Sequence, residues 1–126
     1  MTDLADVNQA LATLLVDAVE GVPVYPELPE VAPPPFIVIG PGEPWVDFEG
    51  APFGRCRLHL AATFVADVGT NDVRVNELTA AVLAIMRTVN DSDDFMVVQV
   101  DQPGQISISG QAHLAASVQT LTEVDV

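Results

Sequence analysis

The segment from Arg55 to Val89 constrains the fold most, because a strand pattern is followed there by a helix pattern after a short turn. Alternate residues from Cys56 to Ala66 are apolar, which is the period of a strand with one buried face. The turn, residues 67–71, offers Asp, Thr and Asn as helix N-caps. Two elements with one apolar face each are expected to pack together. The helix stripe consists of Val75, Leu78, Val82, Ile85 and Val89.

The chain before this segment predicts a helix and a connector. Apolar residues at helical spacing predict a helix over Thr2–Glu20, ended by Gly21 and Pro23. The proline-dense run Pro23–Pro35 is incompatible with a helix and unsuited to a central strand. We interpret it as a rigid crossing segment that begins with a short strand at Val22–Tyr25. The helix stripe consists of Leu4, Val7, Leu11, Leu14, Leu15 and Ala18.

A β-hairpin is predicted next. Phe36–Ile39 is a short apolar run closed by Gly-Pro-Gly at 40–42, which indicates a buried strand followed by a turn. Residues 44–49 alternate, and a second turn at 50–54 leads into the long strand that begins at Arg55. The second arm of this hairpin is therefore long.

Three aromatic residues, Trp45, Phe48 and Phe53, cluster at the predicted hairpin tip. One interpretation is that they pack back onto the core. The other is that they anchor a partner protein on a protruding arm, because aromatic residues are enriched at interface hot spots. The sequence leaves both interpretations open.

The C-terminal part predicts further strands. Phe95–Val100 is a strand, residues 101–104 form a turn, residues 105–109 add a few strand positions, and a long strand follows Gly110. Helices and strands do not alternate as in βαβ units. The expected fold is α+β, with two helices packed on one face of a mostly antiparallel sheet that carries an extended β-hairpin. The length of 126 residues predicts a single domain over residues 1–126.

The charge balance excludes several functions. Eighteen acidic residues face four arginines and no lysine, for a net charge of −14. A P-loop and a Schiff-base enzyme both need a lysine, and binding to nucleic-acid phosphates needs basic patches. No apolar run approaches the ~18 residues of a membrane span, and the acidic N-terminus is unlike a signal peptide. A single cysteine excludes an internal disulfide.

The candidate catalytic and metal-binding groups of the sequence lack the spacing that their chemistry needs. Cys56 and His59 lie three apart on a strand, so their side chains face opposite ways. His59 and His113 are the only histidines, and their meeting across adjacent strands would still leave no third metal ligand. The acidic run 90–94 lacks the glycine and distal glutamate of an EF-hand. Ser107 and Ser109 lack the GxSxG spacing. We therefore expect no catalytic residue, no cofactor and no metal site.

The arrangement as a whole resembles the tail-terminator proteins of long-tailed bacteriophages, the minor-tail-protein-U-like group, also called tail completion proteins. The resemblance covers most of the chain and is a matter of layout. It rests on the N-terminal amphipathic helix and the proline-rich crossing into PPPFIVIG. It continues through the hairpin into CRLHLAATFVADVGTNDVRVNELTAAVLAIMRTV and ends on a strand, HLAASVQTLTEVDV.

The resemblance implies a structural virion protein without enzymatic activity. Such proteins form a hexameric ring that caps the tail tube, stops its polymerisation and joins the tail to the neck of the head. The implied partners are further copies of the chain, the major tail tube protein and a neck or head-completion protein. The implied location is the head–tail interface of the virion, after assembly in the host cytoplasm. DNA would pass through the lumen without being held, and an acidic lumen would repel its phosphates.

Two alternatives remain at this stage. Another head–tail connector component, such as a head-closure or stopper protein, would also form a ring but would dock on the portal side. An acidic DNA mimic would block a nucleic-acid enzyme and would array its carboxylates along one face. The acids here are distributed over both predicted helices, most loops and the chain ends. Trp45, Phe48 and Phe53 are the predicted protein–protein contacts.

Overall fold

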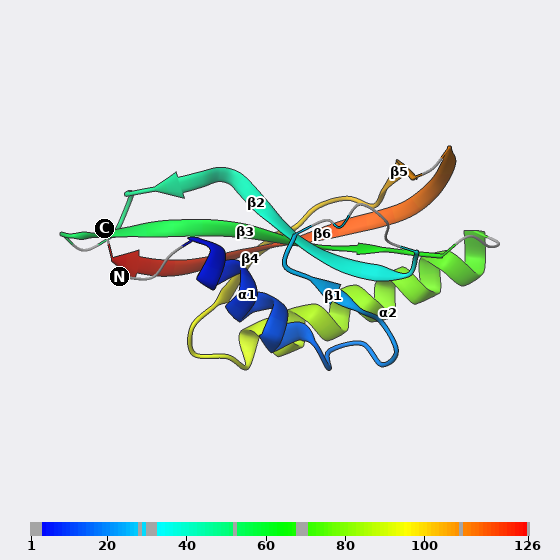
Figure 1. The fold of residues 1–126 in the computed structure, drawn as a ribbon, viewed down its shortest axis with the longest axis horizontal. Coiled ribbons are helices and arrows are strands. Elements are labelled where there is room, and N and C mark those ends of the chain that lie inside the picture. The colour runs from blue at the N-terminus through cyan, green and yellow to red at the C-terminus, as the bar shows by residue number, and fades with distance from the viewer. Residues whose placement is uncertain are drawn as a thin grey trace.

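The computed structural model describes residues 4–27, 29, 33–51, 53–67, 71–108 and 110–125. This part of the chain forms two helices and one sheet of six strands (Figure 1). The helices are α1, Leu4–Leu15, and α2, Asn71–Asn90. The strands are β1, Val24–Tyr25; β2, Phe36–Asp47; β3, Arg55–Val65; β4, Met96–Val100; β5, Gly104–Ile108; and β6, Gln111–Asp125.

The sheet has the order β1-β2-β3-β6-β4, and β5 also pairs with β6. Only the short β1–β2 pair is parallel, and the other pairs are antiparallel. Both helices lie on the same side of the sheet (Figure 1). The predicted α+β class, with two helices on one face of a mostly antiparallel sheet and an extended hairpin, is confirmed.

Strand β3 is the centre of the sheet. It pairs with β6 along its whole length, from Arg55 opposite Asp125 to Val65 opposite Ala115. Its other side pairs with β2. The face that the period of two predicted to be apolar is buried at every position: Cys56, Leu58, Leu60, Ala62, Phe64 and Ala66.

The main core lies between this face and the helices. Helix α1 contributes Val7, Leu11, Ala12 and Leu15 to the core, while α2 contributes Leu78, Ala81, Ile85 and Val89. The predicted place of Val75 in the buried stripe is wrong, because Val75 is exposed. The mean inward direction of the buried α2 residues lies close to Ile85, and at 100° per residue Val75 is turned from it by roughly 75°. Val82, at roughly 55°, is partly buried.

Helix α1 is shorter than predicted. It ends at Leu15, and the chain continues in turns as far as Gly21, where the backbone φ of 74° is one that glycine adopts freely. Backbone bonds between residues three apart, such as Ala18 N to Leu15 O at 3.0 Å, tighten this exit. The predicted extension to Glu20 is therefore wrong. The predicted cap, Thr2, lies outside the described residues.

Strand β2 differs from the prediction at residues 40–42. The chain does not turn there, and one strand runs from Phe36 to Asp47 with a register shift between Pro41 and Val46. Pro41 is opposite Leu60 and Val46 is opposite Leu58, so four residues of β2 bulge over His59. A Cβ at Gly42 would lie 2.7 Å from the His59 Cβ, so this close approach requires glycine.

Among the described residues, a second apolar cluster lies on the face of the sheet away from the helices, at one end. Phe36, Val65 and Ala115 are buried there, and Tyr25 of β1 packs beside Phe36 with ring centroids 5.9 Å apart. Of the short strand predicted at Val22–Tyr25, Val24–Tyr25 forms β1, and just before it the Ile37 N–H of β2 donates to Pro23 O at 2.9 Å. Partly buried Val38 and Ile108 complete this second cluster.

Candidate assembly interface

The hairpin of β2 and β3 forms an arm, and its end carries the three aromatic residues singled out in the sequence. Trp45 is 46% exposed, Phe48 62% and Phe53 107%. We call Trp45, Phe48 and Phe53 the arm tip. None of them belongs to a core cluster, so packing onto the core is wrong for all three. Contact with a partner stays a prediction.

Local hydrogen bonds give the end of the arm its shape. The Glu49 N–H donates to Asp47 Oδ1 at 3.0 Å, and the Ala51 N–H donates to Phe48 O at 3.1 Å. The first bond is an Asx-type turn, in which a short carboxylate replaces a backbone acceptor. Gly50 and Gly54 supply the positive φ angles, 72° and 82°. These bonds turn the chain while leaving the aromatic side chains outside.

Two side chains of β3, His59 and Arg57, contact the end of the arm and support it. The Nε2 of His59 contacts Asp47 Oδ2 across the bulge of β2, and both side chains are largely shielded from water. The Arg57 guanidinium lies against the Gly50 backbone, so a Cβ on Gly50 would approach its Nη2 to 2.9 Å. The bulge and the turn therefore each rest on a β3 side chain.

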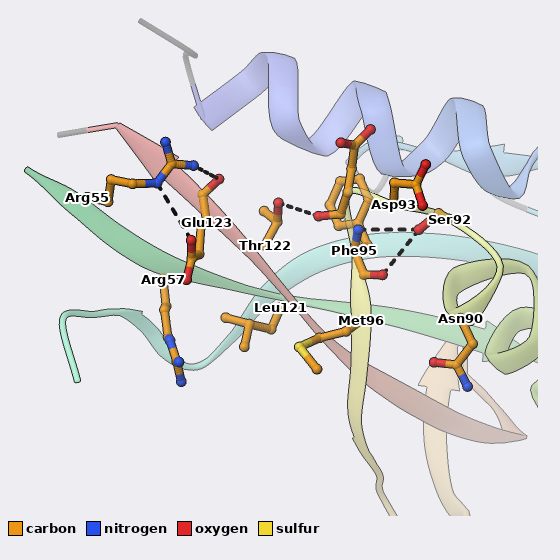
Figure 2. Close-up of a pocket in the computed structure, with 11 residues that line it drawn as sticks. Arg55, Arg57, Asn90, Ser92, Asp93, Phe95, Met96, Leu121, Thr122 and Glu123 are labelled. Atoms are coloured by element: carbon orange, nitrogen blue, oxygen red, sulfur yellow. Dashed lines mark hydrogen bonds and ion pairs between the residues drawn. The ribbon is translucent and has the colours of Figure 1, made fainter. Parts of the chain in front are cut away.

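A polar pocket of about 540 Å³ lies at the base of the arm, where β4 separates from β6 (Figure 2). Arg55 bonds Asp125 there at 2.8 Å and lies 3.6 Å from Glu123. Across the pocket, Thr122 Oγ1 donates to Asp94 O at 2.6 Å. The Ser92 hydroxyl in the lining of this pocket bonds backbone groups of Val89 and Phe95. These bonds, together with those of Arg55 and Thr122, hold the strand ends.

The two edges of the sheet are open over part of their length. Strand β1 pairs only with Ile37 and Val38, so among the described strands nothing pairs with the outer side of β2 beyond them. The opposite edge presents β4 and β5, which are mostly exposed. Unpaired edges are templates for strand addition. The exposed apolar residues of this second edge are Met96, Val98, Val100 and Ile106.

An apolar groove of about 310 Å³ runs between α2 and the β4–β5 edge. We call it the helix–edge groove. The sequence analysis did not identify this groove. The signal was that α2 has apolar residues, Leu83 and Met86, outside its predicted buried stripe. A helix that buries a single stripe is expected to have polar residues at such positions. Its main apolar residues are Leu78, Val82, Leu83 and Met86 of α2, with Val100 and Pro103 of the edge.

The structure separates the candidate catalytic residues. Cys56 is buried in the sheet, and His59 points to the other face, as the spacing predicted. His113 is buried and its Nδ1 lies 3.1 Å from Ala66 O. The two histidines do not meet: His59 is opposite Leu121, which is eight residues, about 26 Å, from His113 along β6.

Other candidate groups are isolated as well. Within the described ranges, no three His, Cys, Asp or Glu side chains are grouped so that they could hold a metal ion. Ser107 is exposed on β5, and Ser109 lies outside the described residues. Neither described helix is long and apolar enough to cross a membrane.

The sequence of this chain matches no family model and no curated protein.

Proposed function

We propose that this chain is a structural virion protein that forms a ring, caps a phage tail tube, ends its polymerisation and joins the tail to the neck of the head. This is the role of the tail-terminator proteins that the sequence layout resembles. In this proposal the partners are further copies of the chain, the major tail tube protein and a neck protein.

The observation that carries the proposal is the arm with its exposed aromatic tip. Phe53 is fully exposed and Phe48 largely so, although burial of one such side chain stabilises a protein by about 1.5–3 kcal/mol. Apolar groups held outward by an ordered turn are typical of an interface. The open edges of β2 and of β4–β5 differ from each other, which suits head-to-tail contacts between identical subunits.

The charge distribution suits a ring through which DNA passes. The net charge is −14, and two of the four arginines, Arg55 and Arg74, are paired with carboxylates. Few cations are therefore left to bind phosphates, so little counterion-release affinity for DNA is expected. An acidic DNA mimic would be equally repulsive to DNA, but that role gives no function to an exposed aromatic arm.

The first test is the mass of the protein in solution, followed by electron microscopy of any large species. A closed six-fold particle of about 80 kDa, six copies of the 13.3 kDa chain, would support a ring component. Purified tail tubes then separate the two ring functions, since a terminator caps the head-proximal end of the tube and a stopper binds the portal side. A monomer that also ignored added tubes would refute the proposal.

A further inference from the structure

Two apolar surfaces of the described chain have no partner within it. The arm tip projects Trp45, Phe48 and Phe53 into solvent. The helix–edge groove is a concave surface of about 310 Å³, lined by α2 and the β4–β5 edge. The arm tip is a protrusion, which we call the knob, and the helix–edge groove is a hollow, so the two surfaces are complementary in shape.

The arm of a chain cannot reach the groove of the same chain. The arm tip lies next to the Arg55–Asp125 end of the β3–β6 ladder, while the groove lies near Val118, the register partner of Val100. Seven strand residues separate Asp125 from Val118, and at about 3.3 Å per residue this is roughly 23 Å before the tip itself is counted. Ladder pairing of β3 with β6 keeps the arm extended over that whole distance. An arm tip that fills the groove must therefore come from another copy.

The size of the groove fits such an occupant. A hollow of about 310 Å³ is at the small end of binding sites, which span roughly 300–1,000 Å³. It holds one or two aromatic side chains but no large ligand. Its floor is made of Leu, Val and Met side chains, and methionine adapts its shape to aromatic rings.

Arg87 beside the groove and Glu49 beside the arm tip have opposite charges. Each surface also carries the other sign: Asp101, whose carboxylate accepts hydrogen bonds from Gln99 and Gln119, lines the groove, and Arg57 lies against the arm-tip turn. Arg87 lies one turn after Leu83 on α2 and is exposed, and its guanidinium has no ion pair or hydrogen bond with any residue that the structure describes. The arm tip is flanked by Glu43 and Glu49, and both are exposed. The chain has only four arginines, and the Arg87 guanidinium beside the groove favours a partner surface that carries an acidic residue.

We infer that a second copy of this chain inserts its arm tip into the helix–edge groove, with Phe53 as the anchor and Arg87 facing Glu49. The inference rests on the proposed function, because this contact would be the subunit interface of the ring. Each copy has one knob and one hollow at different places, so the contact is head-to-tail and builds a ring where it closes and a filament where it does not.

A mixing experiment tests the direction of the contact. Phe53→Ser removes the knob and leaves the groove intact, whereas Leu83→Ser damages the groove and leaves the knob intact. Each variant alone is expected to fall from the ring to a 13.3 kDa monomer, a sixfold drop in mass. An equimolar mixture retains one intact knob and one intact groove per pair, so it is expected to give a dimer of about 27 kDa and nothing larger, from two 13.3 kDa chains.

Val73→Ser is the matched control. Val73 lies on the same helix, is 53% exposed against 43% for Leu83, and is outside the groove. This variant is expected to keep the wild-type mass. Equal loss of assembly in the Val73 and Leu83 variants, or a mixture that stays monomeric, would overturn the inference.

Disulfide trapping gives an answer even where the wild-type ring does not persist in solution. A Phe53→Cys copy is mixed with a differently tagged Leu83→Cys copy and oxidised mildly, while the buried Cys56 remains in both. The cross-linked heterodimer is expected in roughly tenfold excess over that formed with Val73→Cys, because docking raises the local thiol concentration. Equal yields from the two partners would contradict the inference.

The outcomes separate this inference from the proposed function. A six-fold ring without the Phe53–Leu83 cross-link leaves the terminator proposal in place and removes this contact. The cross-link together with open filaments, or with no binding to tail tubes, leaves the contact in place and removes the terminator proposal.

Discussion

The centre of the sheet and the arm tip are built from the same two strands, β2 and β3, yet their side chains meet opposite surroundings. At the centre, alternate residues of β3 are buried under α1 and α2, and Phe64 is fully enclosed. At the tip, Phe53 is fully exposed on an ordered turn. Packing in the core explains an apolar aromatic residue at Phe64, whereas Phe53 belongs to no core cluster of the described residues.

The largest expected effect is a loss of stability at the centre. Phe64→Ala leaves a cavity between β3 and the helices, and we expect it to lower the free energy of unfolding by about 3–5 kcal/mol. The measurement is urea unfolding followed by circular dichroism. Phe53→Ala is the matched control and is expected to change stability by less than about 0.5 kcal/mol, because the Phe53 side chain is fully exposed. Similar losses for both variants would remove the distinction between the two regions.

The second effect is on assembly. Trp45→Ala is expected to leave unfolding unchanged and to weaken subunit or tube association by about 2–4 kcal/mol, as truncation of an aromatic anchor does. Light scattering over a dilution series measures this shift. Unfolding of the monomer by this substitution would place Trp45 with the core residues.

The third effect lies at the bulge that joins the two regions. Gly42→Ala places a Cβ 2.7 Å from the His59 Cβ, so β2 must move away from β3 there. We expect a loss of about 1–3 kcal/mol in unfolding free energy, as for other overpacked sites. Gly40→Ala is the control, since its Cβ would meet nothing within 4 Å. If the two alanine variants are equally stable, β2 does not cross His59 so closely.

The smallest effect concerns the side-chain brace of the arm. His59→Leu keeps the Cβ beside Gly42 but removes the ring nitrogen that contacts Asp47. We expect a loss of about 0.5–1.5 kcal/mol, the usual worth of one such hydrogen bond. Amide hydrogen exchange should rise in residues 45–51 and stay unchanged at the centre of β3. Uniform acceleration along β3 would mean that His59 supports the whole sheet.

The elements predicted well from the sequence are those that bury one side in the core and leave the other side more exposed to solvent. Strand β3 and helix α2 bury one side, so their apolar residues recur with a period that the sequence displays. The C-terminal strand β6 was located for the same reason. Val75 was misplaced because the mean inward direction of α2 depends in part on Ala81, whose small side chain gives a weak hydropathy signal.

The elements predicted poorly depend on contacts between distant residues. The Gly-Pro-Gly segment at 40–42 has turn chemistry, yet pairing of its flanks with β3 keeps it in one strand. The helix–edge groove arises where α2 lies beside an edge whose residues are far away in the sequence. Exposure of the arm tip was one of two open alternatives, because an aromatic cluster has the same local pattern inside a core and at an interface.

The β3–β6 ladder has a mechanical consequence for any assembly that holds the protein by its arm. Eleven consecutive residue pairs join the two strands, from Arg55–Asp125 to Val65–Ala115. Interstrand hydrogen bonds lie across the strand direction, so tension applied along the arm loads all these pairs in shear at once. Tension applied across the strands would instead open the pairs one after another, from the end. The arm is therefore stiff and strong in the direction in which it projects.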